Sequence, residues 1–239
     1  CFIMQRQEHK FFVKREDVSL ISNLLKPLMY LDRNCKSDKP YTITSIYFDS
    51  PKDEDLLDKL NGIRFREKYR VRYYNDERER AKFEVKRKIE NSVEKLSIDL
   101  NFDEQKSILS GDYSCLKKHA EFEYIAYKMD FKCYKPKAVV RYDRLAFTLP
   151  FNNIRVTLDL NIRSTGFYSG HIEGSCLAGK LIMPVGYEVL EVKFLGEFPD
   201  YLKKLLSGFS LTRSSIGKYI LARFYNNSEL NGDNPVLPF

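Results

Sequence analysis

The sequence predicts an α+β fold in which about eight antiparallel strands close into a barrel that helices flank. Segments that alternate apolar and polar residues, or that are rich in β-branched and aromatic residues, recur along most of the 239 residues. Helical patterns stand between these segments and finish the chain. Roughly eight strands suffice to enclose a space that is wide enough for a ligand, so the fold offers an enclosed site.

Composition and charge place the chain among globular proteins with an anionic partner. The hydrophobic content of 43% supplies a core, and we expect a single domain over residues 1–225 with a tail at 226–239. With 40 Lys and Arg against 33 Asp and Glu, the formal charge of +7 points to an anionic partner. Five scattered cysteines lack the spacing of a zinc site and predict reduced thiols. Since the chain has no apolar run of membrane length and no signal-peptide pattern at its start, we expect a cytoplasmic domain.

The first quarter of the chain predicts two strands and two helices. Residues 5–14 alternate in the manner of a strand, and apolar residues at helical spacing follow in residues 16–30. Residues 41–50 are rich in β-branched and aromatic side chains, which favours a strand. Pro51 and the carboxylates after it open a short helix, which Gly62 ends.

The stretch RFREKYRVRYY, residues 64–74, predicts a strand with a dense row of charge. Alternate side chains of a strand point to opposite faces, so one face would carry Arg64, Arg66, Lys68, Arg70 and Arg72. Like charges in one row repel one another, so this row predicts a site for a polyanion. Residues 81–89 and 95–100 continue as strands of one antiparallel meander, and the first of them carries lysines at alternate positions.

The rest of the chain predicts helices and strands in larger blocks. Length and composition predict helices at residues 102–111 and 114–131. Strand patterns follow at residues 136–150, 154–162, 181–183 and 187–194, and helices finish the fold near residues 199–206 and 214–226. The sequence shows no internal repeat and no low-complexity tract, which favours one domain.

Three of the expected strands carry the same Glu-x-Lys spacing: Glu8-His9-Lys10, Glu84-Val85-Lys86 and Glu191-Val192-Lys193. Residues two apart in a strand point the same way, so each triad places one carboxylate and one ammonium on one face. Carboxylate oxygens suit Mg²⁺ or Mn²⁺, and ammonium and guanidinium groups suit phosphate oxygens. A single copy is more simply a solvated face with ion pairs. Three copies beside the row of five cations favour a site for a metal and phosphates.

Seven short pieces of the sequence lie in order between about Arg6 and Arg223: SIYFDS, REKYRVRYY, FEVKRK, YDRLAF, RVTLDLNIR, YEVLEVKF and SSIGKYIL. Together they resemble the catalytic domain of the vacuolar transporter chaperone (VTC) type, a polyphosphate polymerase domain of the triphosphate tunnel metalloenzyme (CYTH) superfamily. The resemblance implies a closed tunnel of about eight antiparallel strands, lined with basic residues. It also implies transfer of the terminal phosphate of ATP onto a polyphosphate chain with a divalent metal, Mn²⁺ or Mg²⁺.

The resemblance assigns roles to residues in the matching pieces. The phosphate-binding residues would be Lys10, Arg70, Arg72, Lys86, Lys95, Arg144, Arg155 and Lys218, and our prediction adds Lys88 and Lys193. The predicted catalytic residues are Arg70, Arg72, Lys86, Arg144 and Arg155. Glu191 would be the metal carboxylate, whereas Glu8 and Glu84 are metal candidates by their spacing. Residues 64, 66 and 68 lie near the start of their strand and are expected at the tunnel mouth or in solvent.

One departure from the superfamily pattern bears on the activity. The hydrolase and cyclase branches begin with Glu-x-Glu-x-Lys, whereas this chain has Arg6-Gln7-Glu8-His9-Lys10. Arginine in place of the first glutamate removes a metal carboxylate and adds a phosphate donor, which favours the polymerase. An inorganic triphosphatase of the same fold, and a module that binds polyphosphate or inositol polyphosphate without chemistry, remain alternatives.

The predicted partners are ATP and a polyphosphate or triphosphate. Glutamates interleaved with the cations, and the lack of a known RNA or DNA motif, argue against nucleic acid. Related domains in eukaryotic vacuoles are attached to membrane helices, so a membrane-attached partner is a further alternative. The chain opens on Cys1 instead of methionine, which hints at an excised fragment.

Overall fold

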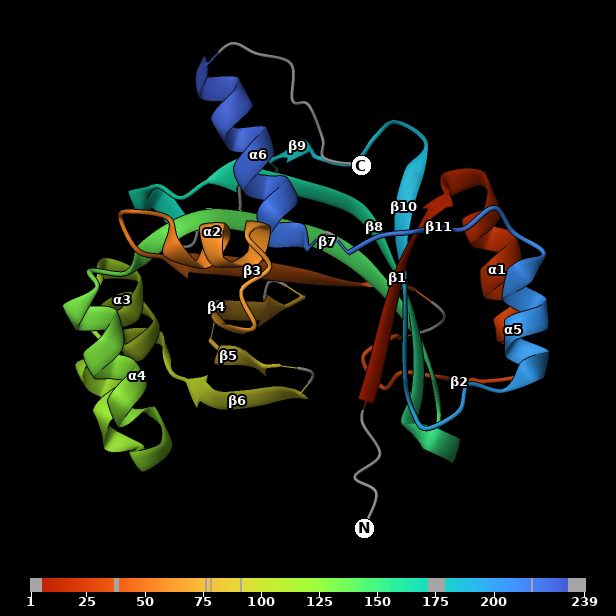
Figure 1. The fold of residues 1–239 in the computed structure, drawn as a ribbon, viewed down its shortest axis with the longest axis horizontal. Helices are drawn as coiled ribbons and strands as arrows, with labels where there is room; N and C mark the ends of the chain where they lie inside the picture. Colours follow the sequence, from red (N-terminus) through yellow and green to blue (C-terminus); the bar gives the residue numbers. More distant parts are fainter. Residues whose placement is uncertain are drawn as a thin grey trace.

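One curved antiparallel sheet carries the strands, and helices cover its outside (Figure 1). The structure is a computed structural model that describes residues 6–36, 39–75, 77, 79–90, 92–171, 179–215 and 217–231. The strands are β1 (Arg6–Lys14), β2 (Tyr30–Leu31), β3 (Tyr41–Asp49), β4 (Phe65–Tyr74), β5 (Ala81–Ile89), β6 (Ser92–Leu100), β7 (Lys135–Leu149), β8 (Ile154–Gly166), β9 (Lys180–Leu181), β10 (Tyr187–Leu195) and β11 (Thr212–Arg213). The helices are α1 (Val18–Leu25), α2 (Glu54–Leu60), α3 (Phe102–Ser110), α4 (Ala120–Phe131), α5 (Asp200–Ser207) and α6 (Lys218–Asn231).

The order of strands in the sheet differs strongly from their order in the chain. They pair as β11-β1-β10-β8-β7-β3-β4-β5-β6, and the two-residue strands β2 and β9 pair with β7 and β8. Every one of these pairings is antiparallel. Segments far apart in the sequence therefore become neighbours, as where Arg6 of β1 lies opposite Leu195 of β10. The predicted α+β class and the antiparallel sheet are confirmed.

The predicted closed barrel of eight strands does not form, because the sheet stays open between its two ends. Within the described residues, no backbone pairing joins β1 or β11 to β6. β11 occupies the outer edge of β1, where Thr212 pairs with Phe12. Side chains span the opening instead, since Nζ of Lys86 on β5 lies 3.0 Å from Oε2 of Glu8 on β1. The sheet is thus a deep trough whose walls meet through an ion pair.

Several element boundaries differ from the prediction, those of α1, α4 and α6 among them. α1 ends at Leu25, two residues before Pro27, which cannot continue a helix, and β2 begins within the range predicted as helical. Residues 114–131 divide into a 3₁₀ turn and α4, because His119 between them takes an extended backbone. α6 continues beyond residue 226 to Asn231, and residues 232–239 of the expected tail lie outside the described residues.

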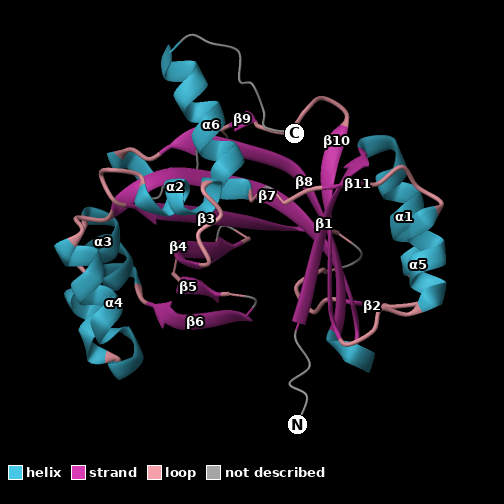
Figure 2. Cartoon of the chain, in the orientation of Figure 1, coloured by secondary structure: helices cyan, strands magenta, loops and turns pink. Residues whose placement is uncertain are grey.

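Helices lie outside the sheet (Figure 2), and alternation along each strand separates an apolar outer face from a charged inner face. In β4, Tyr69, Val71 and Tyr73 are buried in a core with residues of α3 and α4. Arg70 and Arg72 of the same strand point into the trough. A second core joins α1, α5 and α6 to β1, β7, β8 and β10. The helices therefore bury the outer face of the sheet, and the charged face is left to line the interior.

Two further expectations concern the membrane and the cysteines. Across the described ranges, no helix combines the length and the apolar character that crossing a membrane requires. Cys35, Cys115 and Cys133 carry free thiols. Cys1 and Cys176 lie outside the described residues.

Asp49, at the end of β3, joins the sheet to two helices. Its buried carboxylate accepts hydrogen bonds from two backbone N–H groups of α2, at 3.0 and 3.1 Å, and from the hydroxyl of Tyr219 on α6, at 2.7 Å. One turn further along α6, Arg223 donates to both carboxylate oxygens of Asp53, at 2.8 and 2.7 Å. These bonds fix α6 beside α2 on the edge of the trough.

Asp55 of α2 is a buried acid that should govern part of the pH dependence of stability. One of its oxygens accepts a hydrogen bond from the Tyr134 hydroxyl at 2.7 Å, and the other has no hydrogen-bond partner among the described residues. Burial, and then the nearby carboxylate of Asp49, raise the pKa of Asp55 to about 8. An aspartate in the unfolded chain has a pKa of about 3.9. Between these values the folded state holds a proton that the unfolded state has lost, so stability falls as the pH rises from about 4 to about 8.

Asp55→Asn keeps the shape of this side chain but cannot ionise. We expect the free energy of unfolding, measured by urea titration at pH 5, 6, 7 and 8, to decline less with pH in this variant than in the wild-type protein, by up to about 1.4 kcal/mol per pH unit. Glu197→Gln, at an exposed loop position, is the control and should leave the slope unchanged. Equal slopes for Asp55→Asn and the wild-type protein would show that Asp55 is already ionised in the folded state.

Candidate functional site

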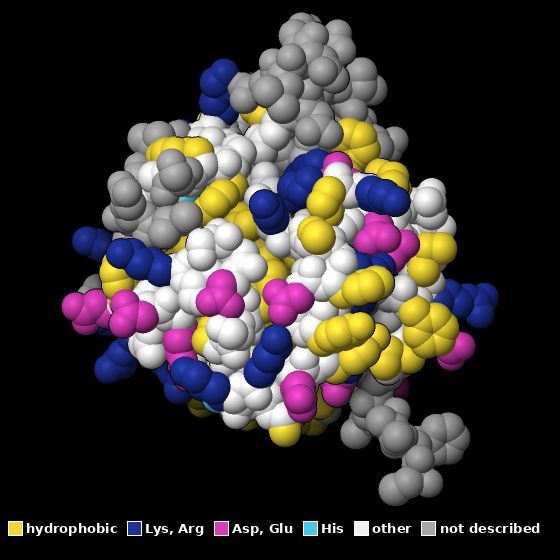
Figure 3. Space-filling view, turned by 90° about the vertical axis from the view of Figure 1, so that its left-hand side faces the viewer, with side chains coloured by type: hydrophobic (Ala, Val, Ile, Leu, Met, Phe, Trp, Pro, Cys, Tyr) yellow, Lys and Arg dark blue, Asp and Glu magenta, His cyan; other side chains and the backbone are white. Residues whose placement is uncertain are grey.

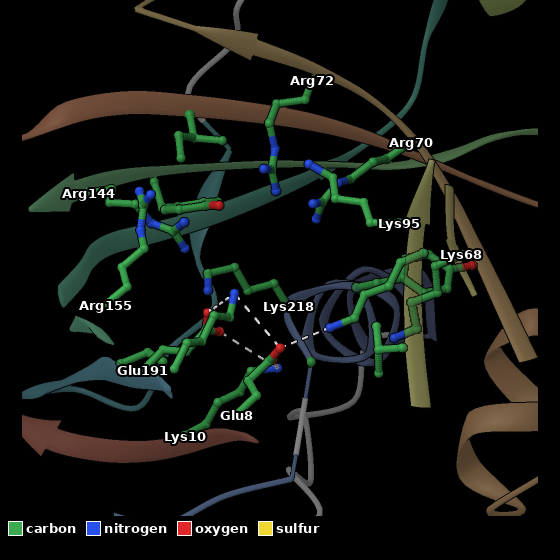
Figure 4. Close-up of a pocket in the computed structure, with 18 of the residues that line it drawn as sticks. Glu8, Lys10, Lys68, Arg70, Arg72, Lys95, Arg144, Arg155, Glu191 and Lys218 are labelled. Carbon is green, nitrogen blue, oxygen red and sulfur yellow. Dashed lines mark hydrogen bonds and ion pairs between the residues drawn. The ribbon is translucent and has the colours of Figure 1, made fainter. Parts of the chain in front are cut away.

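The inner face of the sheet encloses a cavity of about 710 Å³ (Figure 4). Strands β1, β3, β4, β5, β6, β7, β8 and β10 contribute side chains to it, as does the amino end of α6. Eleven of the thirteen predicted site residues line the cavity: Lys10, Arg70, Arg72, Lys86, Lys95, Arg144, Arg155, Lys193, Lys218, Glu8 and Glu191. The other two, Glu84 and Lys88, do not line it.

Glu8 and Glu191 form one charged cluster with three lysines (Figure 4). β1 and β10 run antiparallel, so their Glu-x-Lys triads place Lys10 opposite Glu191 and Glu8 opposite Lys193. Nζ of Lys10 lies 2.9 Å from Oε1 of Glu8 and 3.9 Å from Oε2 of Glu191. Lys193 contacts both carboxylates as well, and Lys86 reaches Glu8 from β5. The repeated spacing in the sequence thus produces a network of alternating charge.

Glu84 is a buried counter-ion outside that cluster. It lies opposite Arg70 of β4, whose Nε and Nη2 are 2.8 and 2.7 Å from its Oε2. Arg72 reaches the same oxygen at 3.4 Å, and Lys95 of β6 binds Oε1. Burial raises the pKa of Glu84, but these three cations outweigh it and bring the pKa to about 2. The structure therefore does not bring Glu84 together with the other two metal candidates, and Glu84 instead fixes three phosphate-binding candidates from behind.

Asp159 is also a buried counter-ion of cations that line the cavity, on β8, although it was not among the predicted site residues. It is fully buried on β8, opposite Arg144 of β7, which donates to its two oxygens at 2.6 and 2.8 Å. Lys218 at the start of α6 donates to Oδ2. Burial raises the pKa of Asp159, but Arg144 and Lys218 outweigh it and bring the pKa to about 2. A signal was present in the sequence, because Asp159 falls on the same face of its strand as Arg155.

Three other cations differ in their placement. Arg155 lines the cavity with its Nη1 at 2.9 Å from Oδ2 of Asp32. Lys88 stands two residues beyond Lys86 on β5 and does not reach the cavity. Lys68, which was expected at the tunnel mouth or in solvent, lines the cavity.

The cavity carries a large excess of positive charge. Among the described residues, its lining holds twelve Lys and Arg side chains and three carboxylates, those of Glu8, Asp32 and Glu191, an excess of nine. The buried carboxylates of Glu84 and Asp159, which bind lining cations, reduce that excess to seven. The whole chain also has seven more basic than acidic residues, so the charges outside the cavity balance one another. Figure 3 shows basic and acidic side chains interspersed over one outer face. An anionic partner is therefore expected inside the cavity.

The carboxylates of the cavity allow a limited metal site. In the part of the chain that the structure describes, no three His, Cys, Asp or Glu side chains lie close enough together to hold a metal ion. Burial raises the pKa values of Glu8 and Glu191, but the surrounding lysines outweigh it, so the pKa of Glu8 is about 2 and that of Glu191 lies well below its usual range. Two ionised carboxylates fit Mg²⁺ or Mn²⁺, which bind through one or two carboxylates together with phosphate oxygens and water. The carboxylates of Glu8 and Glu191 therefore fit a divalent metal ion, provided that phosphate oxygens supply further ligands.

Comparison with protein families gives one match, to the VTC domain, over residues 5–224. The chain belongs to the VTC domain family. The match spans almost the whole described fold and every predicted site residue, and it confirms the family that the sequence pieces resemble. Comparison with curated proteins gives no match.

Solved structures also align with this VTC domain. A "putative adenylate cyclase" from Bacillus halodurans aligns with a TM-score of 0.50 at 16% identity, over 93% of this chain and 100% of that one. A protein of the same description from Vibrio parahaemolyticus aligns with a TM-score of 0.48 at 14% identity, over 91% and 97%. The Schizosaccharomyces pombe Mediator head module gives 0.49 at 12% identity, over 88% and 100%. The Bacillus protein shares the fold, and its low identity carries no statement about activity.

Glu84→Gln should destabilise the VTC domain, because it leaves Arg70, Arg72 and Lys95 beside one another without a counter-ion. Removing one partner of a buried ion pair costs about 3–5 kcal/mol, and urea unfolding at pH 7 should show a loss of about 3 kcal/mol. Added tripolyphosphate should restore more stability to this variant than it adds to the wild-type protein, since its charge replaces the missing carboxylate.

Glu94→Gln is the control for that experiment. Glu94 is half-exposed on β6 and pairs with Arg87 on the outer part of the sheet, so its loss should change the free energy of unfolding by less than about 1 kcal/mol. A loss in Glu84→Gln that is no larger than in Glu94→Gln would contradict the role of Glu84 as counter-ion.

Proposed function

We propose that this VTC domain is a polyphosphate polymerase, which transfers the terminal phosphate of ATP to the end of a polyphosphate chain inside the cavity. The charge of the cavity carries this proposal, because twelve cations line about 710 Å³ that three lining carboxylates only partly neutralise. A condensed phosphate is negative along its whole length, so it matches a lining that is cationic on opposite walls. Membership of the VTC family supports the same class of substrate.

Two pairs of arginines would hold the phosphates from opposite walls. Arg70 and Arg72 project from β4, whereas Arg144 and Arg155 project from β7 and β8 (Figure 4). A guanidinium group offers two parallel donors to phosphate oxygens, which a lysine cannot. The carboxylates behind these arginines hold them in place and leave some N–H groups free to bind a ligand. One is the buried Nε of Arg72, which has no hydrogen-bond partner in the part of the chain that the structure describes.

Glu8 and Glu191 would hold a divalent metal beside the phosphates. When bound, the metal would supply positive charge between phosphate oxygens and so reduce the repulsion between the donor and the acceptor. Lys10 and Lys193 contact both carboxylates and would keep them in position. Lys86 lies across the opening of the sheet and forms an ion pair with Glu8. On binding of the ligand, its ammonium would leave Glu8 and contact a phosphate oxygen instead.

The transfer needs no protein base. An oxygen of the terminal phosphate of the acceptor chain attacks the γ-phosphorus of ATP, the bond from that phosphorus to the β,γ-bridging oxygen breaks, and ADP leaves with the electron pair. The attacking oxygen is already ionised, so no proton has to move. Glu8, Glu84 and Asp159 each have a pKa of about 2, which suits charge partners and not general acids or bases. The protein would contribute positioning and charge compensation.

Product analysis tests the proposal. The purified domain with ATP and Mn²⁺ or Mg²⁺ should form an acid-stable phosphate polymer and release one ADP for each phosphate added. Arg70→Ala and Glu191→Gln should each reduce the rate by at least about 100-fold, because each removes charge compensation at the transferred phosphate. Lys204→Ala, at an exposed position of α5, is the control and should keep full activity.

Other outcomes of the same assay would identify one of the two alternative functions. Orthophosphate from tripolyphosphate or ATP, with no polymer, would assign an inorganic triphosphatase of the same fold. Binding of tripolyphosphate with no product from folded protein, in either metal, would assign a module for polyphosphate or inositol polyphosphate. Either result would contradict the polymerase.

A further inference from the structure

Lys68 differs from the other cations that line the cavity. Nine of them form an ion pair with a carboxylate. Among the described residues, the ammonium of Lys68 has neither an ion pair nor a hydrogen bond, and the four charges that act on it most strongly are all positive. Arg6 and Arg33, the other two lining cations without a carboxylate partner, are exposed to solvent. Lys68 is therefore an interior cation without compensation.

The positive charges around Lys68 come from four elements of the fold. They belong to Lys10 on β1, Lys59 on α2, Arg66 on β4 and Lys86 on β5. Burial, and then these four cations, lower the pKa of Lys68 to about 7. A lysine ordinarily has a pKa of about 10.4, so the ammonium of Lys68 reduces the stability of the free protein.

Lys68 also reaches the turn that leads into α6. A Cβ atom placed on Gly217 would lie 3.4 Å from Nζ of Lys68. The carbonyl of Gly217 accepts a hydrogen bond from the N–H of Leu221, so α6 begins here, and its first N–H groups have no acceptor within the helix. Those N–H groups carry partial positive charge. An anion at this point would meet both a full charge and backbone donors.

We propose that Lys68 and the turn at Gly217 form an anion subsite that binds one phosphate group of a condensed phosphate. The inference rests on the proposed binding of condensed phosphate in the cavity. An unpaired ammonium among four other cations opposes folding. A bound phosphate removes that penalty, so binding of a phosphate gives a reason for a lysine at this position. Lys68 stands across the cavity from Glu191 (Figure 4), so the subsite would take a phosphate at a distance from that metal candidate.

Occupation of this subsite should be coupled to proton uptake. A bound phosphate favours the charged form of Lys68 and returns its pKa toward the ordinary value. Because that pKa is about 7 in the free protein, binding should take up about half a proton at pH 7 and nearly one at pH 8. Tripolyphosphate still carries part of its last proton at pH 8 and can release it on binding, so the uptake that belongs to Lys68 is the difference between the wild-type protein and Lys68→Met.

Calorimetric titration with tripolyphosphate, in two pH 8 buffers of different ionisation enthalpy and without metal or ATP, measures this uptake. Lys68→Met should abolish it and weaken binding roughly tenfold to a hundredfold. Lys68→Arg, which is always charged, should keep the affinity and lose the uptake. Lys95→Met removes a lining lysine that is not among the four cations that act most strongly on Lys68, so it should weaken binding and keep the uptake.

Thermal unfolding separates a binding residue from a structural one. Without ligand, Lys68→Met should raise the melting temperature, because it removes an unpaired charge, whereas loss of a structural lysine would lower it. Proton exchange that is the same in Lys68→Met as in the wild-type protein would overturn the subsite and leave the polymerase standing, since no turnover is measured. Failure of the wild-type protein to bind tripolyphosphate at all would overturn both.

Discussion

The structure depends on buried carboxylates that hold positive charge together on the inside of a curved sheet. Glu84 and Asp159 each lie opposite an arginine of the neighbouring strand, and each also binds a lysine from a third element. Without them, the cations of each wall would repel one another in a partly desolvated space. The same contacts fix the arginines before any ligand arrives, so less side-chain freedom remains to be lost on binding. The stability of the sheet and its readiness for an anion come from the same pairs.

Strand alternation lets this one sheet serve as both core and binding surface. A slip of one residue would exchange the two faces, so the buried rings of Tyr69 and Phe83 on the outer face also determine where Arg70 and Glu84 point. The seam between the ends of the sheet is different, because among the described residues it is joined by side chains and not by backbone pairing. Phosphate can compete for an ion pair across that seam, whereas it could not displace a backbone ladder.

Features that follow from local alternation were accessible from the sequence, and features that depend on distant segments were not. The charged face of β4 and the Glu-x-Lys triads could be recognised because period-two spacing needs no knowledge of neighbours. The counter-ion role of Asp159 depends on the register of β7 and β8, which shifts between Arg141 and Asp143. The open seam depends on which strands end the sheet, and at one end β11 pairs with Phe11 and Phe12 of β1 from about 200 residues away in the chain. Lys68 gains its significance only once β1, α2 and β5 surround it with charge.

The most direct test of phosphate binding in the cavity is a crystal structure of the domain with tripolyphosphate and Mn²⁺. We expect the phosphates inside the cavity, with guanidinium groups of Arg70 and Arg72 on one side and of Arg144 and Arg155 on the other within hydrogen-bonding distance of their oxygens. Phosphates bound only on the outer surface, or a cavity that stays free of phosphate although it is open to solvent in the crystal, would contradict a cationic site for condensed phosphate.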